Sequence, residues 1–290
     1  MILVIDALNE HRFADVLEDM FRLRARVFGE RLGWDVKIEN GMEIDEFDAL
    51  NPAYVVGLDD DGNVIACVRA LQTTGPHMLS DVFSSILDGE PPMRSATLWE
   101  STRFCVDTDR LDRGTGRSSI SYATCELMTG SLEYARDAGI TDIVTVIDPV
   151  MDRVLKRSDN APYAYVGSRK PMGKVSALAA LLDCSDERIE RVRNFAGIEG
   201  DVFVDENVLR ARLDQKSATR NAMSNAVDKA LAEAAEFTTI SCVEMLDYCT
   251  DQIRAARSVD ELEAAMRIVQ ELMTNHKPAE LGGLLERQVQ

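Results

Sequence analysis

The chain has 290 residues, of which 50 are Asp or Glu and 32 are Lys or Arg, so its formal net charge is -18. Such an acidic chain excludes a protein that binds nucleic acid or an anionic membrane over its whole surface, and we expect neither partner. Hydrophobic residues make up 46% and charged residues 28% of the chain, as in a globular protein that buries a sizeable core.

Strands precede long helices in the first part of the chain. A weak alternation predicts an edge strand over 1–6, and apolar residues at helical spacing predict an amphipathic helix over 9–28, with Asn9 as its N-cap. The segment 29–50 has turn-forming residues and no clean period, which predicts a loop. Two antiparallel strands are expected around a glycine-containing turn, over 53–58 and 64–71.

Helices and strands then alternate up to about residue 167. The predicted elements are a short helix over 78–87, a strand over 96–106, a helix over 118–138, a strand over 142–147, a basic helix over 149–157 and a strand over 163–167. An antiparallel meander that passes into a strand-helix-strand unit predicts a mixed sheet with helices on its faces, which is an α/β (α+β) fold.

The last 80 residues have a different composition. Residues 211–290 contain two aromatic residues and no glycine before Gly282, and are rich in Ala, Leu, Met and Glu. They predict three helices in a small bundle. Two of these helices are expected over 243–256 and 259–273, and the last one is capped by Ser258 with Glu261 at its third position. We therefore divide the chain into a domain of residues 1–210 and a helical extension of unknown role, for which oligomerisation is one candidate.

Cysteine, histidine and hydropathy patterns point to a cytoplasmic protein without a metal. The six cysteines include no CxxC pair, which favours reduced thiols. The three histidines lie far apart in the sequence, so we expect no metal site. No stretch approaches the length of a membrane span, and the first residues show no export signal.

Two carboxylates beside aromatic residues form the first candidate site. Asp45 and Asp48 are three residues apart and follow Phe28 and Trp34 closely in the chain. An aromatic floor next to carboxylates suits a cationic, partly apolar ligand. The alternative is a solvated acidic loop with two aromatic residues in the core.

The strand over 96–106 holds the second candidate. In regular alternation Glu100, Thr102 and Phe104 share one face, and Ser101 and Arg103 share the other, unless a bulge re-aims them. Charges in so apolar a strand cost free energy unless they are paired or line a cleft. The alternative is an exposed ion pair on a surface strand.

A glycine loop before the helix over 118–138 is the third candidate. Gly114, Gly116 and Arg117 belong to the run RGTGR, whose backbone N–H groups could meet a phosphate. The run matches neither the phosphate loop that ends in GK[ST] nor GxGxxG, so a plain turn remains the alternative.

Seven ordered segments resemble the signature of the LuxI-type acyl-homoserine-lactone synthases. They are RARVF over 24–28, LGW over 32–34, EIDEFD over 43–48, VR over 68–69, Phe83, WESTRF over 99–104 and the basic RVLKR over 153–157. The resemblance covers about residues 1–205 and leaves the helical extension without a counterpart.

The resemblance implies a fold and a reaction. The fold is a GNAT-like acyltransferase sandwich whose mixed central sheet has a V-shaped cleft. S-adenosylmethionine, as a substrate and with no further cofactor, gives its α-amine to an acyl thioester, carried by acyl carrier protein or as acyl-CoA. Its carboxylate then closes on the γ-carbon, which releases methylthioadenosine and the lactone signal.

The resemblance also implies roles for individual residues. The catalytic set carried over is Arg24, Asp45, Asp48, Arg69, Glu100 and Arg103, with Glu100 as the general base. The substrate-binding set is Phe28, Trp34, Phe83, Ser101 and Thr145. Arg153, Lys156 and Arg157 would dock an acidic carrier protein, and Gly114, Gly116 and Arg117 would meet the phosphopantetheine phosphate.

Three alternatives remain open at this point. Thr145 either recognises a 3-oxo group on the acyl chain or is simply a core threonine. The chain could be a GNAT-like N-acyltransferase with another amine acceptor, although the usual phosphate-loop pattern is absent. It could also be a regulatory protein without catalytic activity on the same fold.

Overall fold

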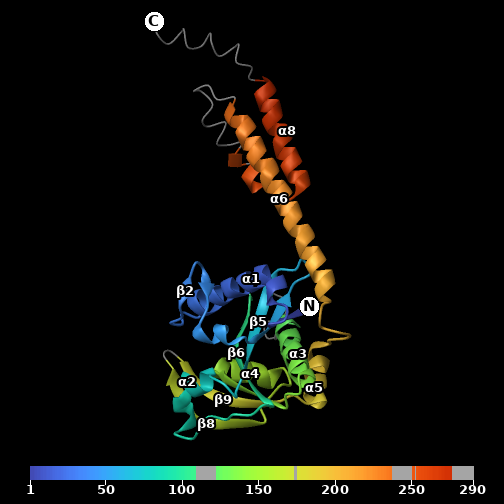
Figure 1. Cartoon of the computed structure of the whole chain (residues 1–290). Coiled ribbons are helices and arrows are strands. Elements are labelled where there is room, and N and C mark those ends of the chain that lie inside the picture. Colours follow the sequence, from blue (N-terminus) through green and yellow to red (C-terminus); the bar gives the residue numbers. More distant parts are fainter. Residues whose placement is uncertain (109–121, 173–174, 237–249, 252, 276–290) are drawn as a thin grey trace. The chain divides into compact units, whose positions relative to one another are not determined.

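The computed structural model describes two compact units. The described residues are 1–108, 122–172, 175–236, 250–251 and 253–275 (Figure 1). The units comprise residues 1–210 and residues 211–290. The division into a synthase domain and a helical extension with a separate role stays a prediction.

A seven-stranded mixed sheet forms the centre of the first unit, as the alternating elements predicted. Its strands are β1 (Ile2–Ile5), β4 (Ala53–Leu58), β5 (Val64–Gln72), β6 (Leu98–Val106), β7 (Asp142–Ile147), β8 (Ala164–Met172) and β9 (Val175–Asp183). They lie in the order β1-β4-β5-β6-β7-β9-β8. Only β6 and β7 are parallel, and every other neighbouring pair is antiparallel.

The sheet splits between its two parallel strands. β6 and β7 pair from Leu98 opposite Asp142 to Ser101 opposite Thr145, and there the pairing ends. Beyond this point β6 stays paired with β5, while β7 stays paired with β9. The V-shaped cleft that the family resemblance implied therefore opens directly after Ser101 and Thr145.

Helices cover both faces of the sheet (Figure 1). Those of the first unit are α1 (Ala14–Arg24), η2 (Ala25–Arg31), α2 (Met78–Asp81), α3 (Tyr122–Asp137), α4 (Pro149–Arg157) and α5 (Asp186–Ala196). The single turns are η1 (Glu10–Arg12), η3 (Glu46–Leu50) and η4 (Ser84–Leu87), and a small hairpin joins β2 (Ile38–Glu39) to β3 (Met42–Glu43). Ala66 and Val68 face the core under α3. Arg69, the next residue, therefore points to the other face, where α1 lies.

The predicted helix over 9–28 is wrong at both ends. The α-helix begins at Ala14, and Asn9 makes no capping hydrogen bond. The Asn9 side chain instead donates to the Val4 carbonyl at 2.9 Å and to Glu206 at 2.9 Å. At its other end the helix continues to Arg31 as a widened π-helical segment, η2. Such π-helical turns are frequent at functional sites.

Other boundaries also differ from the prediction. The expected helix over 78–87 consists of α2 and η4, the last predicted strand extends to Met172, and β9 and α5 were not predicted. β9 reads VSALAALLD, and six consecutive residues of it are buried. A strand that is buried on both faces shows no alternation, and its Ala and Leu residues resemble a helix.

The second unit contains a helix pair with its own small core. α6 (Glu206–Glu236) enters this unit and α8 (Val259–Asn275) follows it. Ile253, Leu262, Ala265 and Val269 are buried together. Ser258 caps α8 as predicted, because its hydroxyl accepts from the Glu261 N–H at 3.2 Å. The predicted helix over 243–256 lies largely outside the described residues.

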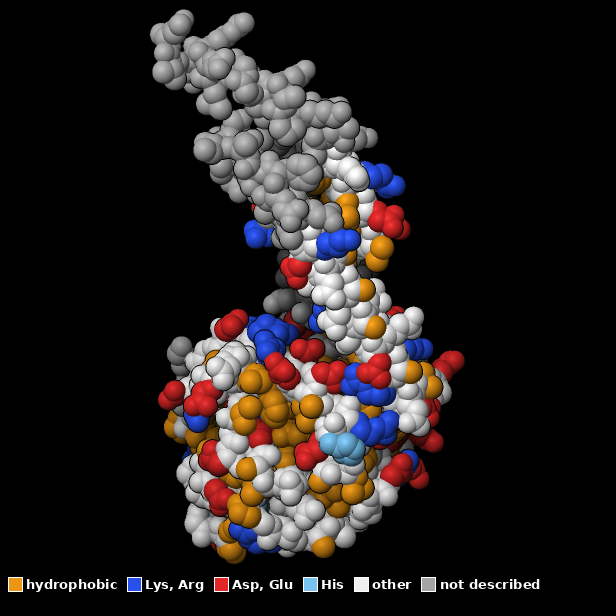
Figure 2. All heavy atoms as spheres, turned by 45° about the horizontal axis from the view of Figure 1, so that its top comes forward, with side chains coloured by type: hydrophobic (Ala, Val, Ile, Leu, Met, Phe, Trp, Pro, Cys, Tyr) orange, Lys and Arg blue, Asp and Glu red, His pale blue; other side chains and the backbone are white. Residues whose placement is uncertain are grey.

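Among the described residues, no helix is both long and apolar enough to cross a membrane. On the face shown in Figure 2, acidic, basic and hydrophobic side chains are interspersed.

Candidate active site

The two predicted aspartates belong to one capped turn. Asp45 is the N-cap of η3, and its carboxylate accepts the Phe47 N–H at 2.9 Å. Asp48 reaches back to accept the Asp45 N–H at 2.8 Å, which completes a capping box. The three-residue spacing therefore places both carboxylates on the same side of a single turn.

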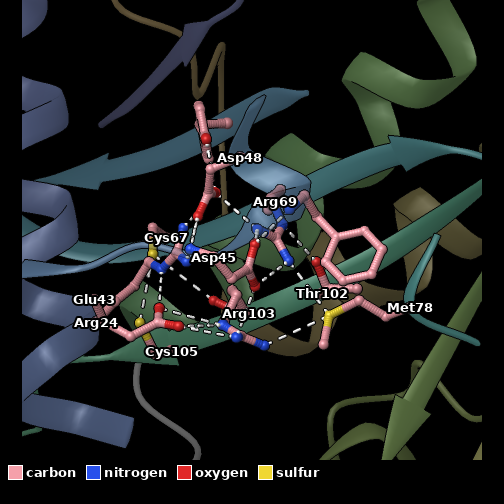
Figure 3. A network of polar contacts seen from close by, with 12 residues as sticks. Arg24, Glu43, Asp45, Asp48, Cys67, Arg69, Met78, Thr102, Arg103 and Cys105 are labelled. Atoms are coloured by element: carbon pink, nitrogen blue, oxygen red, sulfur yellow. Dashed lines mark hydrogen bonds and ion pairs between the residues drawn. The ribbon is translucent and has the colours of Figure 1, made fainter. Parts of the chain in front are cut away.

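Arg24, from the end of α1, holds this turn against the helix (Figure 3). Its guanidinium binds Asp48 with two hydrogen bonds of 2.8 and 2.9 Å and Glu43 with one of 2.6 Å. The Tyr54 hydroxyl also donates to Asp48, at 2.8 Å. The Arg24 side chain is completely buried, so its charge is neutralised by these carboxylates and not by solvent.

Arg69 connects the same turn to the sheet. It extends from β5 and forms ion pairs with Asp45 and, at 2.7 Å, with Asp48. Its Nε donates to the Thr102 hydroxyl on β6 at 3.0 Å. The side chain has no exposed surface, so Arg69 serves here as a buried connector between the turn and β6.

A β-bulge directs Arg103 into the network. The register between β5 and β6 shifts between Cys67 and Arg69, and Arg103 has a positive φ of 56°. Its guanidinium forms ion pairs with Glu43 at 2.9 Å and Asp45 at 2.8 Å. The regular alternation considered from sequence is therefore wrong, and the bulge that we allowed for places Arg103 and Thr102 at the same cluster. The alternative of an exposed ion pair between Glu100 and Arg103 is also wrong.

The cluster has three guanidinium groups and three carboxylates, so its formal charge is balanced. We call it the arginine–carboxylate network; it consists of Arg24, Glu43, Asp45, Asp48, Arg69 and Arg103 (Figure 3). Burial raises the pKa of the Asp48 carboxyl, but hydrogen bonds and charges from Arg24 and Arg69 outweigh burial and hold it below its usual range. The aspartates thus bind arginines in this structure.

Glu100 lies at the same region of β6 but outside the network. Its two carboxylate oxygens accept the backbone N–H groups of Met78 at 2.6 Å and Leu79 at 2.7 Å, where α2 begins. Its side chain is fully buried. Burial raises the pKa of Glu100 to about 7, although the two N–H groups counteract the rise. A carboxylate with this pKa can exchange a proton near neutral pH.

The two predicted aromatic residues stack on one another. The rings of Phe28 and Trp34 are 5.0 Å apart with an angle of 29° between their planes. Phe28 is buried, Trp34 is 42% exposed, and the Arg103 guanidinium lies 5.6 Å from the centre of the Phe28 ring. An exposed aromatic face therefore lies directly beside the network.

Met78 fills a position between two arginines. Its sulfur accepts from Arg69 Nη2 at 3.3 Å and from Arg103 Nη1 at 3.5 Å. Phe83 packs against the small cluster of Met78, Phe47 and Leu71. A thioether is a weak acceptor, so two strong donors meet here on a group that binds them weakly.

The remaining predicted site residues lie in three places. Ser101 and Thr145 face each other at the apex of the split, where the Thr145 hydroxyl donates to the Ser101 carbonyl at 3.0 Å. Arg153, Lys156 and Arg157 are exposed on α4, away from the network. The three residues of the glycine loop, Gly114, Gly116 and Arg117, lie outside the described residues.

Three contributors to the site were not singled out from sequence. Glu43 belongs to the segment EIDEFD but has no role among those that the resemblance implies, although its i, i+2 spacing to Asp45 places both on one side of an extended segment. The sequence pattern places Tyr54 in a strand and Met78 at the start of a helix. A tyrosine hydroxyl in an otherwise apolar strand was an available signal, whereas nothing local distinguished Met78.

The site does not coincide with the pocket that opens on the first unit. A pocket of about 620 Å³ opens elsewhere on the first unit, among Asp6, Leu50, Gln72, Trp99 and Tyr134. None of the site residues predicted from sequence lines it. The network and Glu100, rather than the pocket, are where charge and buried titratable groups converge.

Known proteins share this combination of fold and sequence. Residues 8–192 match the family model described as autoinducer synthase. An acyl-homoserine-lactone synthase of Agrobacterium fabrum is 37% identical over 191 residues, which are 66% of this chain and 90% of the relative. A probable acyl-homoserine-lactone synthase of Sinorhizobium fredii is 36% identical over 192 residues, which are 66% of this chain and 91% of that protein.

Solved structures agree with the sequence relatives. The CoA-dependent acyl-homoserine lactone synthase MesI superposes with a TM-score of 0.61 at 29% identity, covering 71% of this chain and all of MesI. The synthase LasI superposes with a TM-score of 0.56 at 29% identity, covering 71% of this chain and 98% of LasI. These likenesses confirm the expected GNAT-like sandwich and the expectation of an enzyme. The sheet split at its parallel strands, the buried network beside it and these relatives together show that the chain belongs to the autoinducer synthase family.

Proposed function

We propose that the protein transfers an acyl group from a thioester to the α-amine of S-adenosylmethionine and then closes the product to an N-acyl-homoserine lactone. The observation that carries this proposal is the position of Glu100, a buried carboxylate with a pKa near 7 beside the split of the sheet. The aromatic face and the arginines around it provide contacts for a ligand with one sulfonium and one carboxylate.

Glu100 is the proposed general base of the first step. The α-amine must lose a proton before it can attack the thioester carbon, and a group with a pKa near the working pH accepts that proton well. The amide bond forms as the carbon–sulfur bond of the thioester breaks, and the thiol leaves with a proton. Met78 and Leu79 hold the carboxylate in place through their backbone N–H groups.

Arg103 is the proposed contact for the substrate carboxylate. Arg24 and Arg69 are completely buried by their ion pairs, whereas the Arg103 side chain is 10% exposed. A carboxylate oxygen in place of the Met78 sulfur would receive the Arg69 and Arg103 donors at full strength. We therefore expect the Met78 side chain to move aside when the substrate binds.

Phe28 and Trp34 are the proposed contacts for the sulfonium or the adenine. A cation against an aromatic face gains about 0.5 to 2 kcal/mol, depending on how far it is desolvated. In the second step the substrate carboxylate attacks the γ-carbon, the bond from this carbon to sulfur breaks, and methylthioadenosine leaves as a neutral thioether.

Acyl carrier protein is the proposed acyl donor. α4 presents Arg153, Lys156 and Arg157, and the Lys156 ammonium lies 5.5 Å from the Tyr165 ring of β8. β8 adds the exposed Arg169. We call these four cations the α4–β8 basic patch. It is a local region of positive charge on an acidic chain, which suits an acidic carrier protein.

The decisive experiment is a donor comparison with purified protein. Acyl carrier protein or coenzyme A carrying the same acyl group is supplied with S-adenosylmethionine, and methylthioadenosine and lactone are quantified by mass spectrometry. Equimolar release of both products is expected, with a higher kcat/KM for the carrier protein. A higher value for coenzyme A, on which the synthase MesI depends, would overturn the choice of donor alone. Absence of both products with either donor would overturn the reaction.

A further inference from the structure

Two buried cysteines face one another beside the network. Cys67 on β5 is directly opposite Cys105 on β6, and their sulfur atoms are 3.4 Å apart. The two residues share the sheet face of Arg69, because Cys67 is two positions before it. Both are buried, neither is in a disulfide, and the proposed reaction uses neither.

We propose that Cys67 and Cys105 form a site of reversible oxidative modification, at which an intramolecular disulfide lowers the activity of the enzyme. Directly opposed residues of antiparallel strands have Cα atoms about 4.5 to 5.5 Å apart, which lies within the range that a disulfide spans. The sulfur atoms, now 3.4 Å apart, need to approach by only about 1.4 Å to reach bonding distance.

Hydrogen peroxide is the oxidant class that balances the reaction. One thiolate attacks a peroxide oxygen, the O–O bond breaks, and a sulfenic acid and water form. The second thiolate then attacks the sulfenic sulfur, so that the S–S bond forms, the S–O bond breaks and a second water leaves. In total the two thiols lose two electrons and two protons, and one peroxide becomes two waters.

Burial makes this reaction slow. The thiolate is the reacting species, and burial together with the neighbouring Cys67 thiol raises the pKa of Cys105 well above its usual value. The pair therefore reacts only during local opening, under sustained exposure to peroxide, and stays reduced otherwise. This property fits a response to oxidative stress rather than to brief fluctuations.

The position of the pair links oxidation to the active site. The Cys67 thiol lies 3.7 Å from the Arg103 carbonyl, to which it donates a weak hydrogen bond. Arg103 is the bulge residue with positive φ, and it holds Glu43 and Asp45. A disulfide removes the thiol proton that makes this contact and pulls the Cys67 sulfur toward Cys105, which shifts Arg103. A displacement of about 1 Å in a positioned group can cost on the order of 100-fold in rate.

Peptide mapping of the oxidised full-length protein tests the modification. The protein is treated with hydrogen peroxide, denatured, alkylated with N-ethylmaleimide and digested with trypsin. Cys67 falls in the peptide 38–69 and Cys105 in the peptide 104–110, so their disulfide appears as one linked peptide. We expect this peptide to accumulate in parallel with a loss of at least tenfold in methylthioadenosine release, and dithiothreitol to reverse both.

Matched variants separate this pair from the other thiols. Cys67→Ala and Cys105→Ala should each keep their activity during peroxide treatment, whereas the control Cys125→Ala should lose it as the unsubstituted protein does. The proposal is overturned if the linked peptide does not form while the two cysteines are alkylated or over-oxidised, or if Cys105→Ala is inactivated at the unsubstituted rate. Because the linked peptide is read by mass, this readout does not depend on lactone synthesis.

Discussion

At the scale of single residues, the site contrasts two kinds of buried carboxylate. Asp48 is surrounded by guanidinium groups that keep it ionised, whereas Glu100 accepts only backbone N–H groups and has a pKa of about 7. A buried carboxyl group therefore has a different role in each of the two places. Asp48 stabilises a rigid network, and Glu100 remains able to exchange a proton.

Replacing Glu100 with Gln tests its role as a base. Loss of a positioned base costs about 100- to 10,000-fold in rate, so kcat should fall by at least 100-fold while circular dichroism stays unchanged. For the unsubstituted protein, kcat/KM should rise with pH through about 7, because the ionised form of Glu100 accepts the proton. Glu100→Gln should lack this rise. A variant with full activity would remove the assignment.

Replacing Asp48 with Asn tests the network. The substitution leaves Arg24 and Arg69 buried with less negative charge, and breaking such a pair costs about 3 to 5 kcal/mol. Since the folded-state pKa of Asp48 is depressed, its contribution to stability is present above the unfolded pKa of about 4 and is lost as the pH falls below it. The stability gap between the two proteins should therefore be large at neutral pH and shrink in acid.

Urea unfolding at neutral pH and in acid measures this difference in stability between the unsubstituted protein and Asp48→Asn. The matched control is Asp137→Asn, which alters an ion pair with Arg136 whose aspartate is 61% exposed. Exposed pairs contribute about 0 to 1 kcal/mol, so the control should change little. Equal losses in both variants at neutral pH would contradict the special role of the buried pair.

At the scale of elements, the N-terminus of the short helix α2 sets the state of Glu100. The backbone N–H groups of Met78 and Leu79 lower the pKa of a carboxyl that burial raises. His77, before this turn, is extended at φ -156° and ψ 158°, a conformation that the residue before a proline can adopt. Met78 is also the first helical residue, where proline is tolerated.

Met78→Pro removes one N–H from Glu100, and the Glu100 carboxylate must move away because the proline Cδ takes the place of that hydrogen. Losing a bond to the ionised carboxylate raises its pKa, so the rise of kcat/KM with pH should shift above 7. Met78→Leu keeps the N–H and removes only the sulfur, so its pH profile should match that of the unsubstituted protein. Identical profiles for all three proteins would show that this N–H does not tune Glu100.

A second prediction at the scale of elements concerns the exposed charges of helix α4. Arg153 and Arg157 are exposed, whereas Lys156 is already paired with Asp152 at 2.8 Å. The double variant Arg153→Glu/Arg157→Glu should raise the KM for acyl carrier protein about tenfold or more and leave the KM for S-adenosylmethionine unchanged.

A control for net charge uses α6. Arg212→Glu/Arg220→Glu makes the same change in charge on exposed positions of the helical extension, and should leave both KM values unchanged. Steady-state kinetics of the two double variants distinguish docking at α4 from a general effect of net charge. Equal effects of both would indicate a general repulsion rather than docking at α4.

At the scale of the whole molecule, the family match ends at residue 192, and the first compact unit ends at Arg210. The residues between them still belong to the first unit. Arg12 pairs with Glu206 at 2.8 Å, Asp15 pairs with Arg210 at 2.9 Å, and Leu209 is buried. The beginning of α6 is therefore part of the synthase domain by its contacts.

Truncation should separate the two units at this boundary. A chain ending at residue 210 should remain folded and release methylthioadenosine at a rate within about twofold of the full chain, because the contacts of the first unit are retained. A chain ending at residue 205 loses both ion pairs and the buried Leu209, and should have a lower melting temperature. An inactive chain of 210 residues would show that the extension takes part in catalysis.

The sequence by itself determined much of the fold and the membership of the site. Periodicity predicted β4, β7 and α4 with their observed ends, because alternation and capping are local properties. The ordered segments that resemble the synthases contain all six network residues and Glu100, and the roles that the resemblance implies cover each of them except Glu43. Composition separated the helical extension, because a change in residue usage needs no tertiary contact to be seen.

Only the tertiary structure decided how these residues interact. The buried strand β9 lacks a periodic signal, and the bulge that turns Arg103 depends on the register between two strands. Contacts between residues far apart in the chain, such as Arg24 with Asp48 or Cys67 with Cys105, arise from the sheet and its covering helices. Burial then sets the pKa of Glu100, because desolvation is a property of the packed environment and not of the residue.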